Sequence, residues 1–100
     1  MADTSLTLYR GAAATSSTTL YTSPTSIAVS VNNIAIVNTT TAAATATINL
    51  ATVALVSSLS VPANSTQFID TEQIIYSGET ITGSASTTGV NFHINGYEVY

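Results

Sequence analysis

Few residues in this sequence have side chains that could take part in catalysis. A catalytic site needs a nucleophile or a base, and the candidate bases are His93 and five acidic residues. His93 lies between Phe92 and Ile94, so in a strand its side chain points away from theirs. This position favours a histidine that faces solvent or bonds to a hydroxyl group over a general base. No serine lies in a Gly-x-Ser-x-Gly segment, and we expect no enzyme activity.

Metal and cofactor chemistry is equally restricted. Asp70 and Glu72 are two residues apart and would share a strand face. Such a pair could chelate calcium or divide acid and base roles, although a solvated loop pair is favoured. Cysteine and lysine are absent, which removes thiolate ligands, Schiff bases and phosphate-binding lysines. Zinc would need three or four ligands from one histidine and scattered acids. We therefore expect no catalytic residue, no cofactor and no metal.

Composition narrows the class of protein further. Charged residues make up 6% of the 100 residues and the net charge is −4, whereas an ordinary soluble domain has roughly 25% charged residues. Arg10 is the single fixed cation, which excludes nucleic acid binding through phosphate contacts. The 45% of hydrophobic residues can form one core. No apolar run is long enough for a helical membrane span.

The N-terminal residues favour synthesis in a cytoplasm. Asp3 stands where a secretion signal would carry cations, and no apolar stretch follows it. Sequons for glycosylation begin at Asn38 and Asn64, and without export we expect both to remain unmodified.

Period-two alternation and turn residues predict an all-β chain. Threonine, serine, valine and isoleucine dominate, and they suit a half-buried pleated surface. Turn chemistry is found at 62–65, 76–78 and 87–89. We predict a single antiparallel β-sandwich of about seven or eight strands, immunoglobulin-like or jelly-roll-like. The predicted strand segments include Leu6 and Leu8, then residues 27–31, 34–36, 45–50, 53–61, 67–70, 79–86 and 91–100.

Two asparagine pairs leave alternatives open. Asn32-Asn33 shifts the alternation by one residue, which fits a hairpin turn or, preferably, a bulge in one long strand. Asn95-Gly96 is a strong hairpin signal. However, few residues follow it, so a bulge in one terminal strand is equally compatible.

The first 22 residues differ from the predicted sandwich domain at 23–100. They contain a small-residue stretch and fit either an edge strand, which we favour, or an arm that reaches a neighbouring subunit. Exposed aliphatic and aromatic side chains in an arm make good anchors. The candidate interface residues are therefore Leu6, Leu8, Tyr9, Leu20 and Tyr21.

The lack of charge predicts an assembly. Monomeric β proteins commonly protect edge strands with lysine, proline or inward-pointing charge. This sequence has no lysine, so we expect its edges to be covered by other subunits in a homo-oligomer.

Five segments carry a pattern of short apolar strands and turns: 34–38 (IAIVN), 46–50 (ATINL), 61–65 (VPANS), 75–81 (IYSGETI) and 90–99 (VNFHINGYEV). Together they resemble small β-sandwich virion proteins of tailed bacteriophages. One feature differs, because Glu79 follows Gly78 where these proteins often have aspartate, and residues 1–22 match no pattern of the group.

The resemblance implies a structural role in a virion. Such proteins cement or decorate capsids, often as trimers at symmetry axes, or belong to necks and tails. The expected partners are a major capsid protein or other virion proteins, with no nucleic acid and no membrane. Two other functions compete with this one. The first is a tail or neck adhesion module whose loop at 63–67 touches carbohydrate. The second is a filament subunit that polymerises by strand addition.

Overall fold

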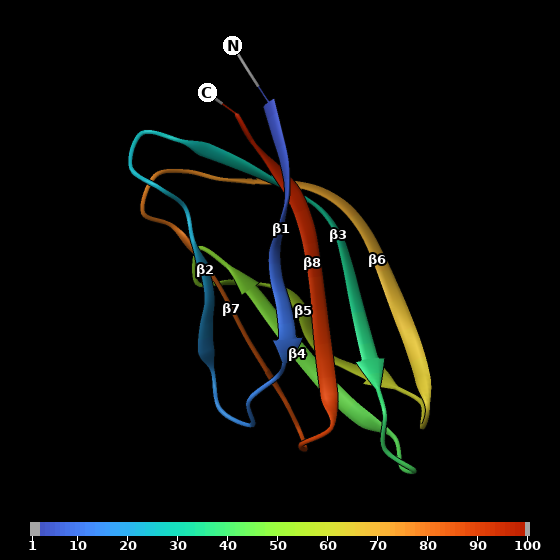
Figure 1. Cartoon of the computed structure of the whole chain (residues 1–100). Coiled ribbons are helices and arrows are strands. Elements are labelled where there is room, and N and C mark those ends of the chain that lie inside the picture. The colour runs from blue at the N-terminus through green and yellow to red at the C-terminus, as the bar shows by residue number, and fades with distance from the viewer. Residues whose placement is uncertain (1–2, 100) are drawn as a thin grey trace.

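The computed structural model describes residues 3–99, and their side chains from Thr7 to Glu98. The chain forms eight strands in two antiparallel four-stranded sheets that pack face to face (Figure 1). Sheet A has the order β1-β8-β3-β6, and sheet B has the order β2-β7-β4-β5. The strands are β1 (Asp3–Ala12), β2 (Thr18–Thr22), β3 (Ala28–Asn38), β4 (Ala44–Leu50), β5 (Val53–Val61), β6 (Ser65–Ile75), β7 (Thr80–Ala85) and β8 (Val90–Val99). The predicted antiparallel sandwich is confirmed.

The strand order is that of a jelly roll. The chain folds back on itself at the turn between β4 and β5, and the pairs β4·β5, β3·β6, β2·β7 and β1·β8 follow outward from that turn. Successive pairs alternate between the two sheets, as in the two Greek keys of a jelly roll. The central turn has positive φ angles of 51° at Ala51 and 66° at Thr52. Positive φ at both central residues gives the twist that a two-residue hairpin needs.

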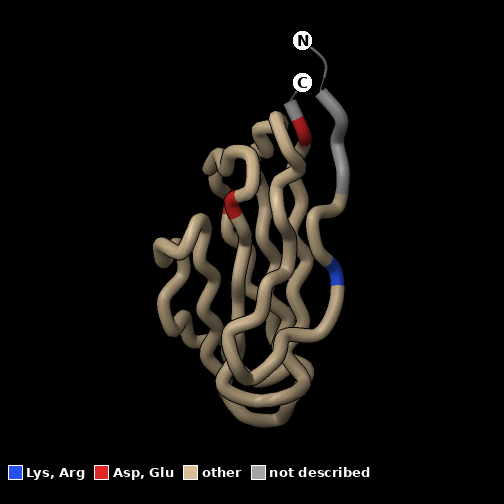
Figure 2. Tube along the Cα trace, turned by 90° about the vertical axis from the view of Figure 1, so that its left-hand side faces the viewer, with Lys and Arg blue, Asp and Glu red and all other residues tan. Residues whose placement is uncertain are grey.

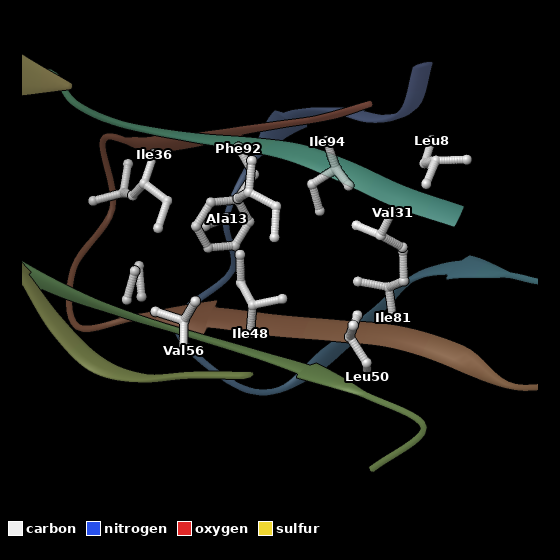
Figure 3. Close-up of a cluster of buried hydrophobic side chains, with 14 of the residues drawn as sticks. Leu8, Ala13, Val31, Ile36, Ile48, Leu50, Val56, Ile81, Phe92 and Ile94 are labelled. Carbon is white, nitrogen blue, oxygen red and sulfur yellow. The ribbon is translucent and has the colours of Figure 1, made fainter. Parts of the chain in front are cut away.

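The core lies between the sheets and is built from alternate residues of each strand. In β4 and β7 every second residue is buried. Phe92 and Ile94 of sheet A point toward Ile48 and Ile81 of sheet B (Figure 3). Gly83 makes room for the Phe92 ring, because a Cβ atom at Gly83 would lie 3.0 Å from that ring.

The pairing register shifts at about the same level in each neighbouring strand pair of sheet A. Asn32 is an extra residue in β3 opposite β8, so the predicted bulge at Asn32-Asn33 is confirmed. The hairpin alternative for Asn95-Gly96 is wrong, because β8 continues through both residues and the extra residues lie in its neighbours. A Cβ atom at Gly96 would overlap the Ser30 carbonyl oxygen. Glycine is needed here for close approach of two backbones.

A buried asparagine organises the loop between β3 and β4. Asn38 is 1% exposed, and its Nδ2 donates to the carbonyl oxygens of Ala42 at 2.8 Å and Val61 at 3.0 Å. Its Oδ1 accepts from the Thr40 backbone N–H at 2.9 Å and from the Thr40 hydroxyl at 2.7 Å. This sequon asparagine therefore has both amide hydrogens in use. The loop runs directly into β4, which begins at Ala44, one residue before the predicted segment 45–50.

The other connections follow the predicted turn residues, with one difference in strand length. Gly78 and Gly89 have φ angles of 80° and 92°, and they lie in the turns that precede β7 and β8. β6 is longer than the predicted segment 67–70, since it spans Ser65–Ile75. The predicted segment ends at Asp70, whereas the backbone continues the strand through Glu72 and Gln73 to Ile75.

Candidate functional site

The two sheets present chemically different outer faces. The outer face of sheet B carries neutral side chains in register: Thr82 of β7 pairs with Thr19 and Asn49, and Ser84 pairs with Thr47. We call this the hydroxyl face. It can exchange hydrogen bonds with water but offers no charged group. Its members are Thr19, Thr22, Thr45, Thr47, Asn49, Thr80, Thr82 and Ser84.

The outer face of sheet A combines charged, amide and aromatic side chains. One cross-strand row runs from Arg10 through His93 and Ala35 to Phe68. The next row runs from Thr7 through Asn95 and Asn33 to Asp70. The Asn33 Nδ2 donates to the Asp70 Oδ1 at 3.0 Å. Because this face combines charge and an exposed ring, it is the better candidate for recognition of a partner.

Exposed apolar side chains lie at intervals along β6 and in the turn that follows it. Phe68 is 69% exposed, Ile74 is 55% exposed and Tyr76 is 61% exposed. We call these three residues the β6 stripe. Exposed Asp70 and Glu72 lie between Phe68 and Ile74 along the strand. Ile74 and Tyr76 are two residues apart in the sequence, and neighbouring exposed apolar side chains are typical of interaction surfaces.

The turn holds Tyr76 in a defined position. The Tyr76 backbone N–H donates to Glu79 Oε1 at 2.7 Å, and the Glu79 N–H donates to the Tyr76 carbonyl at 2.9 Å. The Gly78 N–H donates to the Ser23 carbonyl at 3.0 Å, which ties the turn to the segment between β2 and β3. A partner would thus meet a side chain whose backbone is already ordered, which lowers the entropic cost of binding.

The four predicted interface residues with described side chains lie within or against the core. Leu8 is 6% exposed, and Tyr9, Leu20 and Tyr21 are half-buried against the core. The Tyr21 hydroxyl also donates to Glu98 Oε2 at 3.2 Å, a contact between the two sheets. The Leu6 side chain lies outside the described residues. A docking role for these residues stays a prediction, and the β6 stripe is far more accessible.

The edge strands contain bulges, which can protect a sheet edge in a sequence that has no lysine. The pairing register shifts in the edge strands β1, β2 and β5. In edge strand β6, Thr71 and Glu72 together lie opposite Asn32 of β3. Such bulges twist an edge away from regular pairing. The absence of lysine therefore does not by itself require a partner at the edges. The prediction of an assembly is better founded on the exposed β6 stripe.

The residues considered for chemistry are spread over sheet A. His93 is half-buried, with Arg10 and Ala35 as its register partners. Asp70 and Glu72 line a shallow hollow together with Asn32 and Thr71. Within the described residues, no three histidine, aspartate, glutamate or cysteine side chains gather as a metal site would require. The hollow offers oxygen ligands from two acids.

The sequence contains a signal for the β6 stripe that the sequence analysis missed. Every second residue from Phe68 to Ile74 lies on one face of a regular strand. The two residues between them on that face are the acids Asp70 and Glu72. A face that carries two carboxylates is turned to solvent. Apolar residues on that face are therefore exposed, and Phe68 and Ile74 could have been named on this ground.

Comparison with known proteins adds no assignment, because no family model matches the chain and no curated protein sequence matches it. In the part of the chain that the structure describes, no helix could cross a membrane.

Proposed function

We propose that this chain is a non-enzymatic structural protein of a phage virion. In this proposal it is a capsid cement or decoration subunit that stabilises the shell by bridging neighbouring capsomers. Its partners are the major capsid protein or other virion proteins and further copies of itself, with a trimer favoured. It is made in the host cytoplasm and incorporated into the virion. Neither nucleic acid nor a membrane takes part in binding.

The observation that carries the proposal is the β6 stripe. Phe68, Ile74 and Tyr76 expose apolar surface on a rigid sheet and its adjoining turn. Burial of apolar surface contributes roughly 25 cal/mol per Å², and one protein that binds two capsomers at once gains further from multivalency. The jelly-roll strand order supports a virion role by analogy, since capsid proteins often have this fold. The five segments that resemble virion proteins add to this support.

A second candidate function is an adhesion module of a tail or neck. Lectin domains also use jelly rolls, and sugar rings stack on exposed aromatic side chains. Phe68 and Tyr76 are such side chains, at 69% and 61% exposure. The loop at 63–67 expected to touch carbohydrate includes the start of β6, and it contains no aromatic residue.

Copy number in purified virions separates these functions. We would purify particles of a tailed phage that encodes this chain and quantify its peptides against those of the major capsid protein by mass spectrometry. A copy number comparable with that of the capsid protein supports the cement function. A few copies per particle support the adhesion module, and absence from the particles rejects a virion role. Adding the chain back to depleted particles should raise the temperature at which they release DNA.

A further inference from the structure

The two free edges of sheet A have complementary properties. β1 and β6 lie at opposite ends of the sheet. Each neighbouring pair in this sheet is antiparallel, so β1 and β6 run in opposite directions. A second copy placed beside the first in the plane of sheet A would therefore bring its β1 antiparallel to β6. We infer that copies of this chain associate head to tail through these two edges.

The cross-strand register specifies which residues would meet. Arg10 and Phe68 end the same row on the same outer face. If the second copy continues the sheet without a shift along the strands, its Arg10 lies beside Phe68 and diagonal to Asp70. Diagonal neighbours are about 7–8 Å apart, within reach of a long side chain. The guanidinium group can stack on the Phe68 ring and bond to the Asp70 carboxylate.

The charges at the two edges are opposite and available. Arg10 is exposed on β1, at the outer side of the molecule in Figure 2. Its guanidinium makes a 3.4 Å hydrogen bond to the Thr7 hydroxyl and bonds to no carboxylate of the described chain. Asp70 accepts one hydrogen bond from Asn33, which leaves its second oxygen for a partner. Glu72 is exposed beside it.

The same charges argue against a two-fold symmetric contact through β6. A two-fold contact centred on the middle of β6 would place Asp70 and Glu72 opposite their own counterparts, and like charges that face each other destabilise an interface. A head-to-tail contact joins unlike edges instead. It generates a closed ring if the rotation between copies closes, and a filament if it does not. The inference rests on the homo-oligomer in the proposed function, but it does not require a capsid.

The contact is expected to be weak and carried by side chains. Both edges are interrupted by bulges. In addition, the Tyr9 hydroxyl donates to the Ala12 carbonyl at 2.8 Å and so occupies an acceptor of β1. A continuous ladder of backbone hydrogen bonds between copies is therefore not expected. The oligomer should dissociate on dilution and in high salt, because exposed charge pairs are screened by ions.

A charge exchange tests the inference with the full-length chain. Sedimentation velocity over a range of concentrations would compare the native chain with Arg10→Asp, Asp70→Arg and the double variant. Each single variant brings like charges together, and association should weaken on the order of tenfold. The double variant restores one pair of opposite charges and the native net charge, so its association should return toward the native level. Circular dichroism melts would show that each variant is folded.

A second pair of variants tests the aromatic part of the contact. Phe68→Ser should weaken association, whereas Val53→Ser should not, because Val53 is equally exposed at 69% but lies on β5 of sheet B. A native chain that is monomeric at every concentration would overturn the inference. Oligomers that are insensitive to the single variants, or a double variant that does not recover, would also overturn it.

These outcomes differ from a failure of the proposed function. A chain that associates as expected but is absent from virions refutes only the virion role. A chain that is abundant in virions but monomeric in solution refutes the contact between copies and the proposed homo-oligomer, and leaves the virion role standing.

Discussion

Replacement of Asn38 by alanine should strongly destabilise the fold. Asn38 is 1% exposed and makes four hydrogen bonds at the junction between β3 and the following loop. Alanine removes all four. The Ala42 carbonyl keeps a donor, because the Thr40 hydroxyl lies 2.8 Å from it. The Val61 carbonyl and the Thr40 N–H lose their side-chain partner. Each buried group without a partner costs about 1–3 kcal/mol, so for these two groups we expect a loss of about 2–6 kcal/mol in the free energy of unfolding.

Urea unfolding followed by circular dichroism would measure this loss. A destabilisation of about 3 kcal/mol would lower the Tm by roughly 12–24 °C in a domain of this size. The control is Asn49→Ala, since Asn49 lies on the hydroxyl face and its side chain makes no hydrogen bond to any residue that the structure describes. The control should change stability by less than about 0.5 kcal/mol. If Asn38→Ala were as mild as the control, the hydrogen bonds of Asn38 would contribute nothing to the fold.

Three further substitutions test the sandwich. Gly96→Ala should destabilise by more than about 2 kcal/mol in urea unfolding, because its Cβ atom meets a backbone carbonyl that cannot rotate away; a neutral result would contradict the close approach of β8 and β3. Ile94→Val should cost about 0.5–1.5 kcal/mol, as for deletion of one buried methylene group. The same change at Ile74, which is 55% exposed, should cost less than half as much in parallel melts. Tyr21→Phe removes the hydroxyl that donates to β8, and a loss of about 1 kcal/mol is expected; an unchanged Tm would show that this contact between sheets contributes no stability.

Local sequence patterns predict the fold class but not the strand order. Alternation at Ile34 and Ile36 identifies a buried strand face because a strand has a period of two residues. Nothing local specifies that β3 lies between β8 and β6, since that order depends on contacts between distant segments. Asn95-Gly96 shows the limit most clearly. A positive-φ turn and a close backbone approach both require glycine, and only the neighbouring strands decide between them.

The candidate interface residues lie within or against the core, and their docking role stays a prediction. Leu8 and Leu20 are candidates because aliphatic side chains in an arm make good anchors. In this small sandwich Leu8 belongs to the hydrophobic core, and Leu20 packs against the core. Phe68 and Ile74 were overlooked because apolar residues in a strand are normally assigned inward. Their two-residue spacing from Asp70 and Glu72 indicates instead that they lie on the solvent-exposed face.

The nested strand pairs have a consequence for how the chain folds. Pairing of β1 with β8 joins opposite ends of the sequence, with Asp3 beside Val99, and closing so long a loop in one step is slow. The hairpin at Ala51-Thr52 offers a shorter route, because each pair formed shortens the loop that the next pair must close. We expect folding to begin at that hairpin and to proceed outward. Substitutions in β4 and β5 should then slow refolding, whereas substitutions in β1 and β8 should mainly accelerate unfolding. Rapid-mixing measurements that gave the opposite pattern would place the folding nucleus at the chain ends.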